Sequence, residues 1–306
     1  MNTNNMKNRE RLASGHRTCP GCAIPIIVRT VLSAINEDVV VVGATGCMEV
    51  TTTIYPYTSW NVPFMHNAFE NATATISGIE SAYKALKAKG NIKNNIKFVV
   101  FGGDGGTYDI GLQSLSGAIE RGHDFLYVCY DNEAYQNTGN QRSSASPKGS
   151  KTSTTPIGKY FGKYEYRKDL TKVIAGHNIA YCAQASIAFM DDLINKVKKA
   201  MTIKGPKFIN VLSPCTRYWG IDQSQTVDIA KLAVETNFWP IYEIENGKKY
   251  TINLKNHKTL PITEYLKTQA RFKHLLNPVN KKIVDDIQNH IDEEYKYLLK
   301  LEQISN

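Results

Sequence analysis

The chain of 306 residues has no long hydrophobic run and few cysteines. No stretch approaches the ~18 consecutive apolar residues that a membrane-spanning helix needs. Residues 1–17 are polar and lack the apolar core of a secretory signal, so we expect a cytoplasmic protein. Six cysteines are too sparse for a disulfide scaffold in a chain of this length. These absences exclude membrane-spanning proteins and disulfide-stapled secreted proteins.

The sequence also lacks a concentrated block of basic charge. Its net charge is +9, but lysines and arginines are spread along the chain. A basic excess of this kind fits nucleic acid or an acidic protein partner. Because no long basic block occurs, we favour the protein partner and expect neither nucleic acid nor a membrane to be bound.

Short β-rich runs alternate with helical patterns in most of the chain. Five runs suit strands that are covered on both faces, namely residues 38–43, 97–101, 125–130, 179–182 and 207–212. Helices are expected between them, at about residues 69–86, 107–122 and 188–200. This alternation predicts an α/β fold with an open, mostly parallel sheet and helices on both faces. Ligands of such sheets bind at the carboxyl ends of the strands.

Two segments depart from this alternation. Residues 139–163 are rich in Ser, Thr, Gly and Lys, with five basic residues and no acidic one. Loops of this length are usually functional or disordered, so we expect an ordered functional segment, with a solvated surface loop as the alternative. Past residue 240 we expect a hairpin at 241–254 and then a polar helix. The chain is therefore divided into an α/β domain, 1–240, and a C-terminal extension, 241–306, packed on that domain or on a partner.

A glycine-flanked aspartate, Gly103-Asp104-Gly105-Gly106, follows one apolar strand directly. Glycines let the backbone approach a phosphate, and the N–H groups at the start of a helix favour an anion. The dinucleotide pattern GxGxxG fails because residue 108 is Tyr, and no GK[ST] of a nucleotide-binding P-loop occurs. A carboxylate at this turn suggests a metal that bridges to phosphates, whereas a tight turn with Asp104 as a helix cap is the alternative.

A second polar group, Asn132, follows the next strand of the predicted sheet. It lies 28 residues after Asp104, a separation that one helix and one strand span. Both side chains are then expected at the same carboxyl edge of the sheet. Two oxygen ligands there, with a backbone carbonyl and diphosphate oxygens, would make a near-octahedral Mg²⁺ site.

The cysteines form a third candidate site. Cys19 and Cys22 make a CxxC pair, Cys47 follows 25 residues later, and Cys215 lies in a Ser-Pro-Cys sequence. Four thiolates can hold a [4Fe–4S] cluster. From the residues alone, zinc binding and dithiol redox chemistry stay open as alternatives. Two further cysteines, at positions 129 and 182, interrupt apolar strands and are expected to be buried core residues.

These motifs resemble a known family. The spacing from Gly103-Asp104-Gly105 to Asn132 is similar to the thiamine diphosphate signature. The longer strings GDGGTYDIG and DNEAYQNTGNQRS resemble the β subunit of pyruvate:ferredoxin oxidoreductases and related 2-oxoacid:ferredoxin oxidoreductases. The resemblance extends over about residues 10–275. It implies the diphosphate-binding type of the thiamine diphosphate-binding fold.

The resemblance implies roles for individual residues. Asp104, Asn132 and the main-chain oxygen of Ala134 would bind Mg²⁺, and Asn137 would face the substrate as the catalytic residue. It also assigns Cys19, Cys22, Cys47 and Cys215 to one [4Fe–4S] cluster. The turn after the first strand would touch the cofactor, with an ordinary turn as the alternative. The full set of expected cofactor-binding residues is Thr45, Gly46, Cys47, Glu49, Gly103, Asp104, Gly105, Gly106, Asn132, Asn137 and Thr138.

A neighbouring segment offers one weaker candidate, His66. It would approach the aminopyrimidine of the cofactor across a subunit interface. The alternative is that this segment only caps a helix through Asn67. His16 lies near the proposed cluster and is expected to hydrogen-bond its own loop.

The implied activity is the reversible oxidative decarboxylation of a 2-oxoacid, with pyruvate giving acetyl-coenzyme A and CO₂. Electrons would pass through the cluster to ferredoxin. No segment resembles the domain that supplies the activating glutamate, so we expect an α subunit that provides it and a ferredoxin-like cluster subunit. Branched-chain 2-oxoacids, 2-oxoglutarate and oxalate are alternative substrates. A non-redox thiamine decarboxylase or carboligase and a zinc-stabilised binding module are alternatives of other classes.

Overall fold

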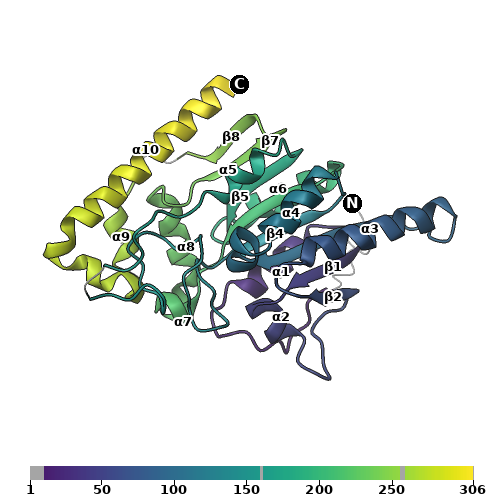
Figure 1. Ribbon diagram of the computed structural model, residues 1–306, viewed down its shortest axis with the longest axis horizontal. Helices are drawn as coiled ribbons and strands as arrows, with labels where there is room; N and C mark the ends of the chain where they lie inside the picture. Colours follow the sequence, from purple (N-terminus) through teal and green to yellow (C-terminus); the bar gives the residue numbers. More distant parts are fainter. Residues whose placement is uncertain (1–9, 159–160, 256–258, 306) are drawn as a thin grey trace.

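One eight-stranded sheet forms the centre of the molecule in the computed structural model, which describes residues 10–158, 161–255 and 259–305 (Figure 1). The strand order is β2-β1-β3-β4-β6-β5-β7-β8. The first six strands of this order run parallel to one another. Strand β7 is antiparallel to its neighbour β5, and β8 is antiparallel to β7. The strands are β1 (Asp38–Ala44), β2 (Phe64–Asn67), β3 (Ile96–Gly103), β4 (Leu126–Asp131), β5 (Tyr181–Ser186), β6 (Lys207–Leu212), β7 (Ile241–Glu245) and β8 (Lys249–Leu254).

Alternating side chains of the central strands enter two separate cores. Val99 and Phe101 of β3 pack on one face of the sheet, and Phe98 and Val100 pack on the other. Because both faces are apolar, both must be covered by helices. The first face is covered by α1 (Ile24–Ser33) and α6 (Met190–Thr202), and the second by α3 (Ala72–Ala88), α4 (Leu112–Glu120) and α5 (Leu170–Ala175). The predicted open, mostly parallel sheet with helices on both faces is confirmed.

The helix predicted from about residue 107 begins differently from the expectation. The chain makes a π-helical turn at Gly105–Asp109 and becomes α-helical only at Leu112. A Cβ atom at Gly111 would lie 2.0 Å from the Gly106 carbonyl oxygen, so the chain is compressed at this junction. Such single π turns occur frequently at functional sites.

Helix α3 also starts later than a cap at Asn67 would require. Asn67 is the last residue of strand β2, and α3 begins at Ala72 with Asn71 in the capping position. The Asn67 carboxamide oxygen accepts a hydrogen bond from the next residue, Ala68 N, at 2.6 Å. The proposed helix-capping role of Asn67 is therefore wrong, because the residue ends a parallel edge strand.

The segment beyond residue 240 continues the main sheet. Strand β7 pairs with β5, and β8 pairs with β7 at the edge. Helix α10 (Lys281–Ser305) then runs along this side of the molecule (Figure 1), where Glu302 Oε1 accepts a hydrogen bond from Ile252 N of β8. The boundary at residue 240 stays a prediction. Shorter helices complete this region, namely α7 (Thr216–Trp219), α8 (Thr226–Glu235) and α9 (Ile262–Leu266).

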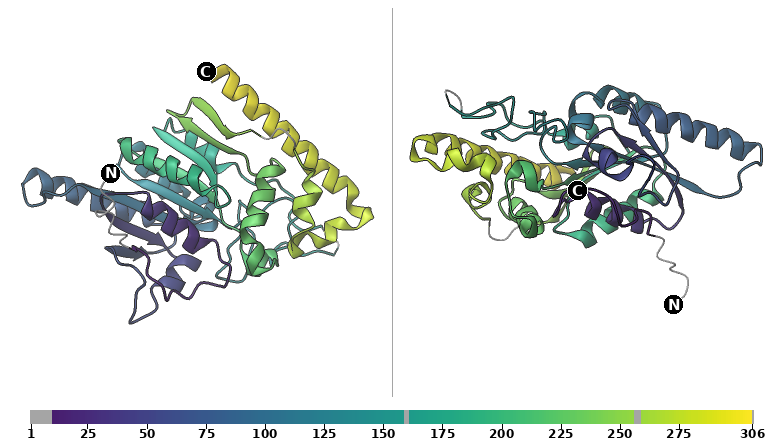
Figure 2. Two further views of the ribbon diagram at one scale, coloured as in Figure 1. Left: turned by 180° about the vertical axis from the view of Figure 1, so that it is seen from behind. Right: turned by 90° about the horizontal axis from the view of Figure 1, so that it is seen from below.

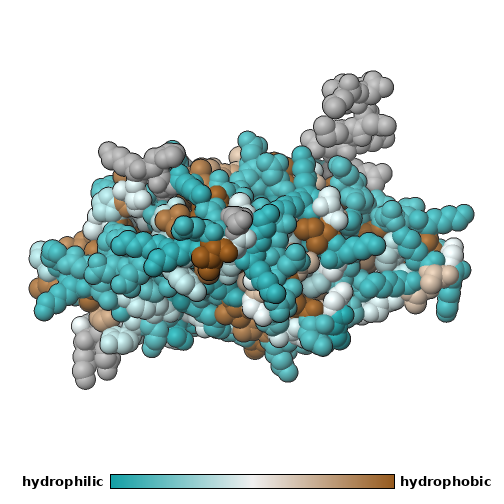
Figure 3. All heavy atoms as spheres, turned by 90° about the horizontal axis from the view of Figure 1, so that it is seen from above, coloured by the Kyte–Doolittle hydropathy of each residue, from teal (hydrophilic) through white to brown (hydrophobic). Residues whose placement is uncertain are grey.

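The part of the chain described has no long apolar helix, and the one face drawn in Figure 3 has no broad apolar surface. None of its helices combines the length and the apolar content that a bilayer crossing requires. On the face drawn in Figure 3, hydrophilic side chains predominate and apolar ones form small separate groups. Figure 2 shows α3 and α10 extending toward opposite ends of the molecule, with the strand ends between them.

Candidate active site

A cavity of about 190 Å³ lies beyond the carboxyl ends of β1, β3 and β4. Parallel strands bring these ends to one edge of the sheet, which is where ligands of such folds bind. Of the residues predicted to contact the cofactor or its metal, Glu49 and the weaker candidate His66 do not line the cavity. The lining residues that were predicted are Thr45, Gly46, Cys47, Gly103, Asp104, Gly105, Gly106, Asn132, Ala134, Asn137 and Thr138.

The turn after β3 has its glycine where a side chain cannot fit. A Cβ atom at Gly105 would lie 2.3 Å from the ring of Tyr135. The Tyr135 hydroxyl donates a hydrogen bond to Asp109 Oδ2 at 3.0 Å, which fixes the ring against the turn. The first N–H groups of a helical turn have no partners within it, so this bare backbone can face an anion.

Asp104, Asn132 and Ala134 bring polar atoms to one point of the cavity. One terminal atom of the Asn132 amide lies 2.8 Å from Asp104 Oδ1 and 2.9 Å from the Ala134 carbonyl oxygen. If this atom is the nitrogen, it donates hydrogen bonds to both oxygens. If it is the oxygen, three oxygens converge, an arrangement that is favourable only around a cation. The oxygen-rich donor set fits Mg²⁺.

Asp104 itself is fully buried. Burial, and next the nearby Asp131 carboxylate, raise the pKa of Asp104 well above its ordinary value. The Ser143 hydroxyl and the Asn132 N–H donate hydrogen bonds to its two oxygens. A buried carboxylate with no adjacent cation is costly, so a divalent ion beside Asp104 would compensate for its charge.

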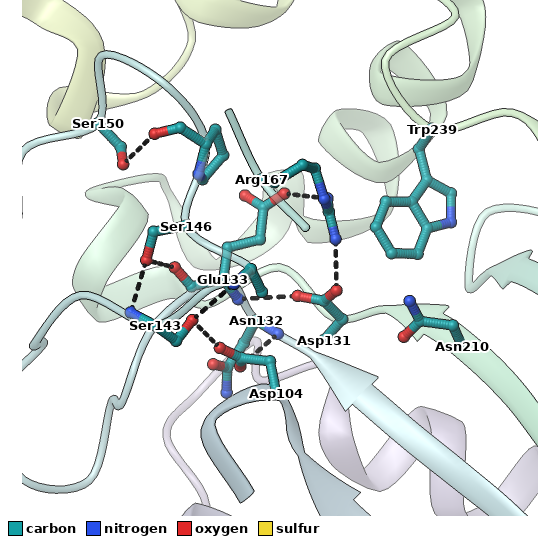
Figure 4. A network of polar contacts seen from close by, with 12 residues as sticks. Asp104, Asp131, Asn132, Glu133, Ser143, Ser146, Ser150, Arg167, Asn210 and Trp239 are labelled. Atoms are coloured by element: carbon teal, nitrogen blue, oxygen red, sulfur yellow. Dashed lines mark hydrogen bonds and ion pairs between the residues drawn. The ribbon is translucent and has the colours of Figure 1, made fainter. Parts of the chain in front are cut away.

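The residues on either side of Asn132 face away from the cavity into a buried ion-pair network (Figure 4). Arg167 donates to Asp131 Oδ2 at 2.6 Å and to Glu133 Oε1 at 3.0 Å. Arg271 donates to the other Glu133 oxygen. Tyr108 donates its hydroxyl hydrogen to Asp131. We call Asp131, Glu133, Arg167 and Arg271 the carboxylate clamp.

The clamp fixes the turn that carries the proposed metal ligands. Glu133 has φ 69°, a left-handed conformation that is unusual for a residue other than glycine. Its buried carboxylate is held on both oxygens, so the surrounding structure enforces this conformation. Asn132 and Ala134 flank Glu133 and are thereby directed toward Asp104. The sequence motif indicated Asn132 but not the clamp.

The basic segment 139–163, apart from residues 159 and 160, covers this turn. Ser143 contacts Asp104, and the Ser146 hydroxyl donates to the Glu133 carbonyl oxygen at 2.6 Å (Figure 4). The buried Lys163 ammonium donates to the Ser146 carbonyl oxygen at 2.5 Å. Burial lowers the pKa of Lys163 to about 8. A solvated loop is the wrong interpretation for residues 143–152, because most of these side chains are buried.

A short polar chain connects the first strand end to β2. The Thr45 hydroxyl lies 2.7 Å from His66 Nε2, and His66 Nδ1 lies 3.6 Å from Glu49 Oε1. Thr45 lines the cavity, whereas neither Glu49 nor His66 does. His66 is partly exposed beside the cavity, at the edge of the sheet.

The CxxC turn packs against the segment that follows Cys215. Cys22 N donates to the Cys19 carbonyl oxygen at 3.0 Å, which closes the turn. Thr226 Oγ1 donates to the Gly21 carbonyl oxygen at 2.6 Å. Gly21 has φ +71°, and a Cβ atom there would lie 2.4 Å from the Gln223 carbonyl oxygen. Residues more than 200 positions apart are thus brought together. His16 hydrogen-bonds Thr18 of the same loop, as predicted.

The four predicted cluster cysteines lie within electrostatic range of one another. Burial, and then the charges of the other cysteines, raise the pKa of Cys22 and of Cys47 to about 12. Burial also raises the pKa of Cys215. Thiols in this state need a cation to become thiolates, and iron bound by four thiolates would supply it.

The spacing of these thiols bears on the zinc alternative. Within residues 10–158, 161–255 and 259–305, no three His, Cys, Asp or Glu side chains gather closely enough to hold a single metal ion. Zinc requires each sulfur at about 2.3 Å from one centre. A four-iron cluster binds each thiolate at a different iron and so keeps the sulfurs further apart than a single zinc ion does. Cys129 and Cys182 are fully buried in the core, as predicted.

Sequence reasoning missed several residues of the site. Phe69, Tyr130, Tyr135 and Gln136 line the cavity, but none was given a role. Tyr135 and Gln136 lie within the string DNEAYQNTGNQRS, whereas Phe69 and Tyr130 lie outside the quoted motifs. The clamp arginines lie 34 and 138 positions from Glu133. The clamp was indicated in the sequence by Asp131 and Glu133 alone, because two carboxylates at a buried strand end require cationic partners.

Comparisons with known proteins identify the family of this chain. Residues 44–211, more than half of the chain, match the family model described as thiamine pyrophosphate enzyme, C-terminal TPP binding domain. The chain is 51% identical over 301 residues to pyruvate synthase subunit PorB of Thermotoga maritima, covering 96% of this chain and 93% of that protein. It is 43% identical over 298 residues to ketoisovalerate oxidoreductase subunit VorB of Pyrococcus abyssi, covering 96% and 94%.

A solved structure shares the fold. The 2-oxoglutarate:ferredoxin oxidoreductase of Magnetococcus marinus aligns with a TM-score of 0.58 and 22% identity, over 74% of this chain and 81% of that chain. The resemblance that the GDG-to-Asn motif suggested is confirmed, and so is the prediction of a subunit that acts with others. The chain belongs to the thiamine diphosphate-binding subunits of the 2-oxoacid:ferredoxin oxidoreductases.

Proposed function

We propose that this subunit serves the reversible oxidative decarboxylation of pyruvate to acetyl-coenzyme A and CO₂. One observation carries the proposal: Cys47 lines the cofactor cavity and also lies within electrostatic range of the other three predicted cluster cysteines. A thiamine enzyme without redox function would have no use for such an arrangement. Here it would place an electron acceptor directly beside the carbon that is oxidised.

The metal of the cofactor is proposed to be Mg²⁺. Asp104, the Asn132 side-chain oxygen and the Ala134 carbonyl oxygen would hold it, since Mg²⁺ prefers oxygen ligands. Thiamine diphosphate, when bound, would supply the thiazolium chemistry that the decarboxylation of a 2-oxoacid needs. This chain orients the diphosphate through the bare backbone at Gly105 and Gly106. Asn137 and Thr138 line the same cavity, and Asn137 is proposed to contact the substrate.

The electron acceptor is proposed to be one [4Fe–4S] cluster held by Cys19, Cys22, Cys47 and Cys215. It would take up electrons one at a time and pass them toward ferredoxin. The chemistry of four mutually interacting thiols, three of them partly buried, supports this assignment. Free thiols persist in reducing compartments, which supports a cytoplasmic location as part of the proposal.

The proposed partners follow from what the cavity does not supply. Among the described residues that line it, the only ionisable side chains are Cys47, Asp104, Tyr130 and Tyr135. The glutamate that activates the aminopyrimidine would therefore come from an α subunit. A ferredoxin-like cluster subunit, ferredoxin, the 2-oxoacid and coenzyme A are the other proposed partners. Neither a membrane nor nucleic acid is part of the proposal.

We propose pyruvate as the substrate, and not another 2-oxoacid, because the PorB relative is 51% identical to this chain whereas the VorB relative is 43% identical. The test is the activity of the co-expressed complex with pyruvate, 2-oxoisovalerate, 2-oxoglutarate and oxalate, followed by ferredoxin reduction. We expect the highest kcat/KM with pyruvate. A preference for 2-oxoisovalerate would overturn the substrate assignment and leave the reaction class intact.

A further inference from the structure

The hydroxyl of Tyr130 is buried without a hydrogen-bond partner in the part of the chain that is described. Tyr130 lies near the end of β4, is 1% exposed, and packs in the core that also receives Cys22 and Cys47. A buried polar group left unpaired costs about 1–3 kcal/mol. A neighbouring group that becomes a hydrogen-bond acceptor when the site is loaded is therefore expected.

The position of the hydroxyl is defined by two glycines of the cavity wall. A Cβ atom on Gly46 would lie 3.1 Å from the Tyr130 hydroxyl oxygen, and one on Gly103 would lie 3.4 Å from it. The hydroxyl thus sits between the ends of β1 and β3, where the cofactor cavity and Cys47 adjoin. Only residues without side chains leave room for it there.

Two neighbours of the phenol can be told apart by their chemistry. The Met48 N–H is close enough to affect the phenol, but an N–H only donates, so the hydroxyl hydrogen stays available. Cys47 is the other neighbour, because it directly follows Gly46 and packs against the same core as Tyr130. A thiol is a weak acceptor, whereas a sulfur that ligates iron carries negative charge and is a better one.

We infer that Tyr130 donates its hydroxyl hydrogen bond to the sulfur of Cys47 when Cys47 ligates the [4Fe–4S] cluster, and so raises the reduction potential of that cluster. The inference rests on the proposed function, because it requires Cys47 to be a cluster ligand. Hydrogen bonds to cluster sulfurs help set the potential, since a donor stabilises the added negative charge of the reduced state. Tyr130 is a positioning residue that favours electron transfer out of the cofactor cavity.

The test compares Tyr130→Phe with Tyr181→Phe in the full chain, reconstituted anaerobically with ferrous iron and sulfide. Tyr181 is an equally buried strand tyrosine, but its hydroxyl donates to Glu243 at the opposite end of the sheet. Redox titration followed by electron paramagnetic resonance reports the midpoint potential. We expect Tyr130→Phe to keep four irons and shift the midpoint to a more negative value. Tyr181→Phe is expected to match the wild type.

Two further readouts separate the possible outcomes. Metal-free Tyr130→Phe should be as stable as the wild type or more stable, because it removes an unpaired buried hydroxyl. An unchanged midpoint with a full iron content would overturn the inference. Weaker thiamine diphosphate binding with an unchanged midpoint would also overturn it, because the Tyr130 hydroxyl would then donate to the cofactor and not to Cys47. Incomplete iron in Tyr130→Phe alone would indicate a packing role and contradict it. A wild-type chain that holds no four-iron cluster would refute the proposed function itself.

Discussion

The cofactor cavity and the cysteine site adjoin at Cys47, but the fold builds them in different ways. The cavity wall comes from consecutive strand ends and is fixed by a compressed turn and by the buried carboxylate clamp. The cysteines come from three distant segments, and Cys19 is exposed. The cavity is therefore preformed by the sheet, whereas the cysteine site would reach its final geometry only with its cluster.

This difference predicts different responses to substitution. A single change in the cavity should remove cofactor binding without disturbing the cysteines. A change in the clamp should destabilise the whole domain. A change in the cysteines should affect iron and electron transfer but leave the cavity able to bind its cofactor.

The largest effect is expected for Asp104→Asn. The variant keeps the volume of the side chain but removes the charge at the convergence of Asp104, Asn132 and Ala134. We expect thiamine diphosphate affinity in magnesium to fall at least about 100-fold, or ~3 kcal/mol, in calorimetric titration. Metal-free stability should be unchanged or higher, because a buried charge is lost. Asp285→Asn on the surface of α10 is the control, and unchanged affinity in Asp104→Asn would refute the magnesium assignment.

The next effect concerns the clamp. Arg167→Met leaves Asp131 and Glu133 short of a buried cation, so the free energy of unfolding should fall by about 3–5 kcal/mol. Lys281→Met removes an exposed pair with Asp285 on α10 and should cost less than about 1 kcal/mol. Urea denaturation measures both. A loss in Arg167→Met no larger than in the control would mean that the clamp does not hold the turn.

A pH effect is expected from the segment that covers the cavity. Because the pKa of Lys163 is about 8 in the folded chain and near its ordinary 10.5 when unfolded, the unfolded chain binds more protons between these values. Stability of the wild type relative to Lys163→Met should therefore rise with pH across this window, by up to roughly 3 kcal/mol. Urea unfolding at several pH values measures it, with the exposed Lys151→Met as control. A difference that stays flat or falls would contradict the burial of Lys163.

The smallest effect is expected for the two core cysteines. Cys129→Ala and Cys182→Ala remove one buried sulfur each and should cost on the order of 1 kcal/mol. Iron content should remain that of the wild type in both. Iron loss in either variant, measured by chemical analysis of anaerobically prepared protein, would mean that the ligand set has been assigned wrongly.

Features formed by residues close together in the sequence could be predicted, whereas features formed by residues far apart could not. The strands at 38–43 and 207–212 and the GDG-to-Asn pair are local or one crossover apart, so periodicity and spacing were enough to predict them. Edge strand β2 and helix α1 went unpredicted, because neither was separated from its surroundings by a clear pattern. The clamp could not be predicted, since no rule pairs Glu133 with an arginine 138 positions away.

We propose that one chain holds thiamine diphosphate and a [4Fe–4S] cluster on either side of Cys47. Iron and sulfide analysis with electron paramagnetic resonance, on anaerobically prepared full chain, is the decisive measurement. We expect four irons per chain in the wild type, and a marked loss of iron in Cys215→Ser with cofactor binding retained. A full four-iron content in Cys215→Ser, or zinc in place of iron in the wild type, would contradict it.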